Sequence, residues 1–329
     1  MRVATVEKVI AVSNHTNADN LAVATILGWD VVCKKSECSV DDLVAYVNID
    51  SVVEPHPYFK FLEAKSYRIR PIKIRGVLSQ GLLIPLSELR SFGCDVDNFY
   101  EGQDISSIIK ASHYEKKVPS KMIGNTKGSF PKFLIRTDED NLRNYPNALK
   151  EIHDSEIYIT QKIDGCSATY FVKSGLFGVC SRSLELQPDE NAFWSIVKKF
   201  DLAYKMQNLG SDIAIQGELY GPNIQGNPTG ANQISFAAYN IFFIKERRFG
   251  SLDELTEICQ SLEIPQTKVI YRGPMSHSLG DFIGLANSQL YENQKTGEGI
   301  VIRTVQPVRS KIMGKDRWSA KVLNESYDR

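Results

Sequence analysis

Apolar and polar residues alternate in short runs along the first third of the chain, and turn residues separate the runs. Examples are "RVATVEKVIAV", "LAVATILGWDVVCKK", "DLVAYVNI", "RIRPIKIRGV" and "QGLLIPL". A period of two with many β-branched residues is typical of strands that bury one face. Residues 1–110 are therefore predicted to form a small β-barrel.

The pattern changes after this region. Residues 111–128, "ASHYEKKVPSKMIGNTKG", are polar and basic and contain Pro and Gly, which predicts a linker. In residues 129–329, strand-like runs such as "IYITQKID", "DIAIQGELYG", "ISFAAYNIFFI" and "GEGIVIRTV" recur. Helices are expected at about 190–208 and 252–262. Strands interrupted by a few helices predict an α+β domain with mainly antiparallel sheets.

The second expected helix has a clear start signal. Ser251 followed by Glu254 fits a capping box, in which each side chain accepts a hydrogen bond from the other residue's backbone N–H.

The run "YITQKIDGCSATYF" contains an Asp-Gly pair between two strand-like segments, which predicts a tight turn and a hairpin. Lys162 lies two residues before Asp164. One interpretation is a solvated lysine on a hairpin, and the other is a nucleophile whose charge Asp164 helps to govern. The K-x-D-G pattern alone is weak, since about one chain in ten of this length would contain it by chance.

Further charged or aromatic residues interrupt the apolar alternation downstream, in a fixed order that strengthens the second interpretation. They are Arg182 in "CSRS", Glu218 in "IQGELYG", Tyr239 in "FAAYNI", Glu298 in "GEGIVIRT" and Lys321 in "WSAKVLN".

This set suits nucleotidyl transfer. A lysine attacks an α-phosphate only as the neutral amine, which neighbouring cations or a metal favour. Mg²⁺ requires oxygen ligands, for which Asp164, Glu218 and Glu298 are candidates. A purine requires an aromatic face, which Tyr239 could provide; Phe236 is the alternative, and either ring could instead be core.

Composition and charge limit the kind of partner and the cellular compartment that can be expected. The 39 basic and 39 acidic residues cancel, so net charge indicates no polyanionic partner. Locally, Arg68 and Arg70 share one face at strand period, and Lys73 and Arg75 share one further along. These basic residues could track a phosphate backbone or could form a solvated face. The six cysteines lack C-x-x-C spacing, and the chain has neither an 18-residue apolar run nor a signal-peptide pattern. We therefore expect an intracellular protein that is neither secreted nor membrane-bound.

The ordered motifs resemble those of the covalent nucleotidyltransferases, which include RNA and DNA ligases and capping enzymes. The segments "FPKFLIRTDEDNLRN" and "SRSLELQPDENAFW … IAIQGELYGPNIQGNP … YNI" are similar to ATP-dependent RNA ligases of the Naegleria and Deinococcus type. The resemblance implies an N-terminal OB-like domain and an ATP-grasp-like adenylation domain of antiparallel sheets with flanking helices. It also implies a monomer that uses ATP and Mg²⁺ or Mn²⁺ to join RNA 3′-hydroxyl and 5′-phosphate ends, for example at nicks in a duplex.

The resemblance also assigns roles. Lys162 matches the nucleophile that forms lysyl-AMP, Asp164 the aspartate near the metal, Glu218 a ribose or metal ligand, and Glu298 the glutamate that holds metal water. Residues implied to contact ATP or AMP are Gln161, Lys162, Gly165, Arg182, Glu218, Tyr239, Phe236, Glu298, Lys321 and Asn144.

Three positions depart from the family pattern. Gln161 stands where Glu is usual. Asn141 stands where Arg is common, with Arg143 and Asn144 nearby. Ser319 replaces one of two lysines on the last strand, and Lys315 or Arg317 are candidates to substitute for it.

The alternatives are a DNA ligase, a capping-type enzyme or a non-catalytic RNA-binding protein with a ligase-like domain. The first two normally carry an OB domain after the last lysine motif, and the sequence ends eight residues past Lys321. The third is expected to lose Lys162 or Glu298, yet both are present.

Overall fold

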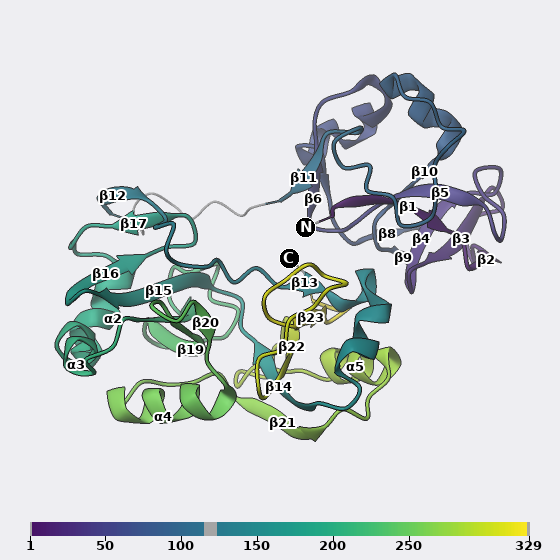
Figure 1. Cartoon of the computed structure of the whole chain (residues 1–329). Helices are drawn as coiled ribbons and strands as arrows, with labels where there is room; N and C mark the ends of the chain where they lie inside the picture. The colour runs from purple at the N-terminus through teal and green to yellow at the C-terminus, as the bar shows by residue number, and fades with distance from the viewer. Residues whose placement is uncertain (1, 115–123, 328–329) are drawn as a thin grey trace. The chain divides into compact units, whose positions relative to one another are not determined.

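The chain forms two compact units, Met1–Lys116 and Lys117–Arg329, in a computed structural model that describes residues 2–114 and 124–327 (Figure 1). The predicted linker, 111–128, begins and ends in strands, β11 (Ala111–His113) and β12 (Thr126–Ser129), and residues 115–123 lie outside the described part.

The first unit consists of short antiparallel strands, as the alternating pattern predicts. Its sheets have the strand orders β1-β5-β10, β2-β3-β4, β11-β6-β7 and β8-β9. Along β3 every second residue is buried, which is the signature of a strand with one face in the core. The elements are β1 (Ala4–Lys8), β2 (Ala11–Asn14), β3 (Leu21–Ile26), β4 (Trp29–Lys34), β5 (Leu43–Val47), β6 (Ser51–Val53), η1 (Pro57–Lys65), β7 (Arg68–Ile69), β8 (Ile72–Ile74), β9 (Val77–Ser79), β10 (Leu82–Pro85), η2 (Leu86–Phe92) and β11.

The basic segment is not the single strand that its spacing predicts. β7 ends at Ile69, Pro71 follows, and Arg75 adopts a positive φ of 45° in the turn between β8 and β9. Proline lacks the N–H that a strand ladder requires, so the chain breaks there. Arg68 also differs from the other three, because it pairs with Asp50 at 3.5 Å and lies over the ring of Tyr114.

The second unit contains two sheets, with orders β12-β17-β16-β15-β18-β19-β20 and β13-β23-β22-β14-β21. In the described residues, their strands pair antiparallel except β13 with β23. The strands are β12, β13 (Asp140–Asn141), β14 (Glu156–Lys162), β15 (Cys166–Lys173), β16 (Leu176–Cys180), β17 (Leu184–Leu186), β18 (Ile213–Tyr220), β19 (Ser235–Phe243), β20 (Arg248–Phe249), β21 (Val269–Pro274), β22 (Gly299–Thr304) and β23 (Ser319–Leu323).

Helices cover one side of each sheet. α2 (Ala192–Phe200), α3 (Leu202–Asn208) and α4 (Leu252–Leu262) lie along the seven-stranded sheet, and α5 (Leu279–Asn287) lies beside β22 and β23 (Figure 1). Two short helices, η3 (Leu142–Asn144) and η4 (Pro146–Ile152), precede β14.

The expected helix over 190–208 is in fact two helices, because Asp201 adopts a left-handed φ of 52° and ends α2. The capping box of α4 is confirmed: Ser251 Oγ accepts the Glu254 N–H at 3.1 Å, and the Glu254 carboxylate accepts the Ser251 N–H at 2.8 Å. The alternation pattern did not indicate α5.

The strand period gives each sheet one apolar and one polar face. On the seven-stranded sheet, Ala168 and Ile215 face the helix-covered core, whereas Ser167 and Glu218 pair on the opposite face. On the five-stranded sheet, Ile159 and Ile302 face the core under α5, and Lys162 and Lys321 occupy the other face. The polar faces converge, because Arg317 donates a hydrogen bond to Asn240 on β19.

Candidate active site

Lys162 and Glu298 form an ion pair at the edge of the five-stranded sheet. Lys162 ends β14 and lies opposite Gly299, the first residue of β22, which places Glu298 beside it. Lys162 Nζ donates to Glu298 Oε2 at 2.7 Å, and the two side chains are 22% and 5% exposed. The sequence-predicted nucleophile therefore lies against one of the predicted carboxylates.

The predicted hairpin at Asp-Gly is wrong. β14 belongs to the five-stranded sheet and β15 to the seven-stranded sheet, so Asp164 and Gly165 lie where the chain crosses between the sheets. A Cβ on Gly165 would lie 2.3 Å from the Leu219 carbonyl oxygen, so glycine permits the close approach of β18. Lys162 is thus placed where the two polar faces meet.

Two tyrosines that the sequence analysis did not identify form hydrogen bonds to the segment that crosses between the sheets. The Tyr291 hydroxyl accepts the N–H groups of Asp164 (3.1 Å) and Glu298 (3.2 Å) and donates to the Lys162 carbonyl (3.2 Å). The Tyr327 hydroxyl donates to Asp164 Oδ2 at 2.8 Å. A tyrosine in a polar loop such as "QLYENQKTG" carries no periodic signal, so the pattern could not have identified Tyr291.

Glu218 completes the acidic side of the site. Burial raises the pKa of its carboxyl to about 7, the charge of Lys162 acts in the opposite direction, and the nearby Asp164 carboxylate raises it further. A half-buried carboxyl with this pKa is partly protonated at neutral pH, chiefly because burial disfavours its charged form.

We expect Glu218→Gln to stabilise the ligand-free protein at pH 8 but not at pH 5. Because the folded-state pKa lies above the ordinary 4.5, stability is lost as pH rises through about 7, where the folded protein must ionise the carboxyl. After allowance for partial exposure that ionisation costs roughly 1–2 kcal/mol, or roughly 3–6 °C in Tm. Thermal unfolding at both pH values measures this. An equal Tm difference at pH 5 and pH 8 would contradict the assignment.

Tyr239 lies on the polar face of β19. Its hydroxyl is 2.9 Å from Thr137 Oγ1 and 3.3 Å from Ser167 Oγ, and burial raises its pKa to about 12. The Arg303 guanidinium lies 5.4 Å from the ring centroid. These contacts fix the orientation of the ring.

Phe236 does not share this position. Its ring is fully buried on the opposite, helix-covered face of β19, where it packs edge-on against Tyr170. The prediction that Phe236 contacts a nucleotide is therefore wrong, because strand alternation places it in the core.

Of the remaining predicted residues, Lys321 shares the polar face with Lys162, whereas Gln161, opposite Ile300, shares the face of Ile159 under α5. Arg182 pairs with Asp138 at 2.9 Å, and Gln161 donates to the Leu290 carbonyl at 2.8 Å. Lys321 lies on β23 between Asn141 of β13 and Val301 of β22, and Asn144 ends η3.

A buried ionic network behind the site was not predicted. Glu139 accepts from Arg303 at 2.8 Å, Arg317 lies 3.7 Å from the same oxygen, and these cations lower the pKa of Glu139 to about 2 in spite of its burial. Lys315 pairs with Asp140 at 2.8 Å. The two candidates to replace a lysine at Ser319 therefore both have acidic partners.

Ser319 itself accepts a hydrogen bond from Arg303 Nε at 2.9 Å. The guanidinium of the neighbouring strand thus places a cation beside Ser319.

No group of three His, Cys, Asp or Glu side chains among residues 2–114 and 124–327 is arranged to hold a metal ion by itself. Within the same ranges, no helix is long and apolar enough to cross a membrane.

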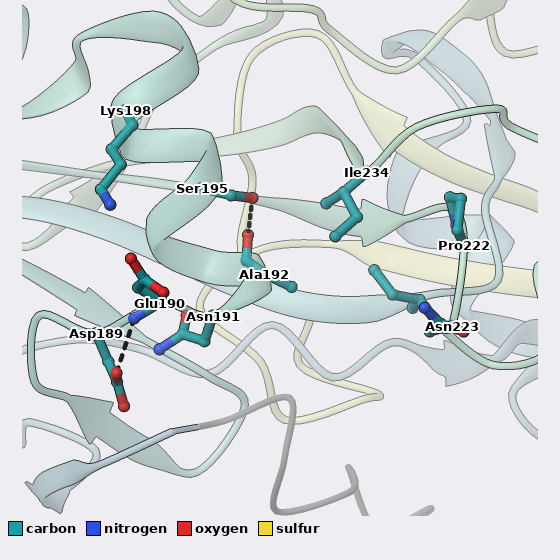
Figure 2. A pocket seen from close by; sticks show the side chains of 10 residues that line it. Asp189, Glu190, Asn191, Ala192, Ser195, Lys198, Pro222, Asn223 and Ile234 are labelled. Atoms are coloured by element: carbon teal, nitrogen blue, oxygen red, sulfur yellow. Dashed lines mark hydrogen bonds between the residues drawn. The ribbon is translucent and has the colours of Figure 1, made fainter.

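A pocket of about 410 Å³ opens beside the start of α2 (Figure 2). Its walls include Asp189, Asn191, Ser195 and Asn223, and Asn191 caps α2 by accepting the Trp194 N–H. None of the pocket's lining residues belongs to the candidate site.

Comparison with known proteins identifies the fold of both units. The first matches an OB-fold domain model over residues 3–86. Solved Naegleria gruberi RNA ligase structures resemble the chain: one with PPi is 24% identical, covering 99% of this chain and 98% of that one, with a TM-score of 0.87. Mutants with AMP and Mn (24% identity) and with ATP and Mn (23%) have the same coverage and TM-score.

The search of curated proteins found no match. The family model described as RNA ligase, however, matches residues 155–323, which is more than half of the chain and includes Lys162, Glu218, Glu298 and Lys321. The chain therefore belongs to the RNA ligase family.

Proposed function

We propose that this protein joins RNA ends in three ATP-dependent steps. Lys162 attacks the ATP α-phosphate and releases pyrophosphate, leaving lysyl-AMP. The AMP passes to the 5′-phosphate of an RNA end, and a 3′-hydroxyl then attacks that end, expelling AMP and forming the phosphodiester. The observation that carries the proposal is the Lys162–Glu298 pair at the meeting of the two polar faces, beside Glu218 and Tyr239.

The ion pair must open for the first step. A carboxylate at 2.7 Å favours the ammonium form of lysine, which is not a nucleophile. We infer that Glu298 orients Lys162 before ATP binds and releases it when another cation offsets the glutamate's charge.

A divalent cation suits the donors present. Asp164, Glu218 and Glu298 supply carboxylate oxygens, the ligands Mg²⁺ and Mn²⁺ prefer, and they are too few to enclose an ion without water. Burial disfavours the charged form of Glu218, the Asp164 carboxylate adds repulsion, and such a cation would offset both. When bound, it would neutralise charge on the phosphate oxygens.

The nucleotide base would stack on Tyr239. Arg303 lies over one side of this ring, and the hydroxyl is held by Thr137 and Ser167, so the ring is oriented before a base arrives. Arg182 and Lys321 would contact the ribose and α-phosphate regions, with Gln161, Gly165 and Asn144 lining the nucleotide.

The OB-fold unit would hold the RNA, as a nicked duplex, through phosphates. Arg70, Lys73 and Arg75 are exposed, whereas Arg68 is engaged by Asp50 and Tyr114 and would contribute less. We further propose a monomer in a reducing intracellular compartment. The scattered cysteines, which lack C-x-x-C spacing, favour such a compartment.

Replacing Arg70, Lys73 and Arg75 by Ala should flatten the salt dependence of RNA binding by roughly one unit of log–log slope for each phosphate that these side chains neutralise in the wild type. The measurement is a filter-binding salt titration on a nicked duplex. Replacing exposed Lys34, Lys35 and Lys60 removes equal charge and is the control. Equal slopes for wild type and the first variant would show that these three side chains do not contact phosphates and form a solvated face instead.

Incubation with α-labelled ATP, then with a nicked RNA duplex, tests the proposed function. We expect label first on the protein through an acid-labile, alkali-stable bond, next on the RNA 5′-end, and finally released as AMP with sealed product. A protein that binds RNA but never acquires label would be a non-catalytic RNA-binding protein.

A further inference from the structure

The Tyr291 hydroxyl lies at the centre of the site without contributing a charge. It contacts three backbone groups from two separate segments: the carbonyl of Lys162 and the N–H groups of Asp164 and Glu298. A backbone N–H can only donate and a carbonyl can only accept, so the hydroxyl proton must point to Lys162 while its lone pairs receive the two N–H groups. One hydroxyl therefore sets the spacing between the lysine segment and the glutamate segment.

Tyr327, in the segment after β23, also contacts Asp164. The Asn324 N–H donates to the Glu298 carbonyl at 3.0 Å, and Glu325 pairs with buried Arg143 at 2.5 Å. Asn287 at the end of α5 donates to Glu325 at 2.8 Å. These anchors bring the Tyr327 hydroxyl to Asp164 Oδ2.

The rings of Tyr291 and Tyr327 lie apart from the apolar clusters of the second unit. Tyr291 is 4% exposed, yet within the described chain neither it nor Tyr327 belongs to an apolar cluster around the sheets. The rings contact each other edge-on, with centroids 6.5 Å apart. The polar ends of both rings are directed to residues of the site.

We propose that Tyr291 and Tyr327 are positioning residues for lysine adenylation, an inference that rests on the proposed function. Tyr291 fixes the distance and direction of Lys162 relative to Glu298. Tyr327 orients the Asp164 carboxylate so that its oxygens are presented to the divalent cation. Hydrogen bonds that orient metal ligands typically change metal affinity or activity 10–100-fold when removed.

The test compares Tyr291→Phe and Tyr327→Phe with wild type. Tyr271→Phe is the matched control, because it also removes a hydroxyl that donates to a backbone carbonyl, that of Pro274. Single-turnover labelling is measured over ranges of ATP and Mg²⁺, Mn²⁺ binding to the ATP-free protein is measured by electron paramagnetic resonance, and thermal unfolding checks that each variant is folded.

We expect Tyr291→Phe to lower the maximal labelling rate roughly 30-fold, with the ATP concentration at half-maximal rate changed less than threefold. Tyr327→Phe should weaken Mn²⁺ binding and raise the Mg²⁺ requirement about tenfold. Tyr271→Phe should match wild type.

A folded Tyr291→Phe with wild-type rate, or a Tyr327→Phe with unchanged Mn²⁺ binding, overturns the inference for that residue. If Tyr291→Phe does not fold, the assignment of a positioning role to Tyr291 is withdrawn in favour of a structural one. A wild type that binds Mn²⁺ but is never labelled contradicts the proposed function instead, and Mn²⁺ binding by Tyr327→Phe still decides the role of Tyr327.

Discussion

Replacing Lys162 by Ala should abolish transfer of label from ATP to the protein, while RNA binding remains close to wild type. The amine is the attacking atom, and Lys162 is the lysine whose amine lies against Glu298 where the two polar faces meet. We expect the labelling rate to fall by at least about 10⁴-fold. Denaturing electrophoresis after incubation with α-labelled ATP measures this.

Lys162→Ala also removes the cation beside a buried carboxylate, so loss of labelling could reflect a disturbed site. Lys162→Arg separates the effects, because it keeps a cation beside Glu298 but replaces the nucleophile. Both variants should lack label, and Lys162→Arg should retain more of the wild-type Tm. Lys198→Ala on α2, on the opposite side of the seven-stranded sheet, should label normally. An alkali-stable AMP adduct on either Lys162 variant would disprove the assignment.

The sequence predicted the fold class and family because both depend on local patterns. Period-two alternation predicted antiparallel sheets and a β-barrel, and the family resemblance implied that the barrel is OB-like, which the OB-fold model and the structural matches confirm. The order of Lys162, Glu218, Glu298 and Lys321 resembled the covalent nucleotidyltransferases, and the longer segments around them resembled RNA ligases, the family that the family model confirms. The roles of the individual residues stay predictions.

The sequence pattern did not predict which strands pair when they lie far apart in the chain. Asp-Gly between two strand-like runs favours a hairpin, but β14 pairs instead with β22 and β21, so the turn becomes a crossing between sheets. The positions of Tyr291 and Tyr327 depend on that crossing, which is why no local pattern indicated them. Helix α5 was missed for a different reason: its glycines, Gly280 and Gly284, have poor helix propensity, and its packing against β22 and β23 compensates.

The buried network of Glu139, Arg303 and Arg317 lies beside Ser319, one of the departures from the family pattern. Ser319 cannot supply a cation, but the antiparallel register places Arg303 directly opposite it and joins the two side chains. The same arginine lies over Tyr239 and binds Glu139, so it links the five-stranded sheet to the candidate base-binding ring. This cross-strand contact depends on the register of β22 and β23, which the sequence motifs alone do not indicate.

Removing divalent metal should stop lysine adenylation, with the rate falling at least about 1,000-fold in excess EDTA. The reason lies in the charges of the site: burial disfavours the charged form of Glu218, and the Asp164 carboxylate adds to that cost, while Lys162 and Arg182 act in the opposite direction. ATP would add several negative charges, and Lys162 must give up its own positive charge before it attacks. We expect Arg182 and Lys321 to be insufficient without an added cation.

The measurement is single-turnover labelling in EDTA and then in added Mg²⁺ or Mn²⁺, each of which should restore the rate because hard divalent ions accept the same oxygen ligands. EDTA loaded beforehand with Mg²⁺ is the control for the chelator itself. Asp164→Asn should raise the Mg²⁺ concentration needed, whereas Asp189→Asn, in the pocket beside α2, should not. Labelling at full rate in excess EDTA would show that Lys162, Arg182 and Lys321 suffice to neutralise the phosphates, and the proposed metal site would be wrong.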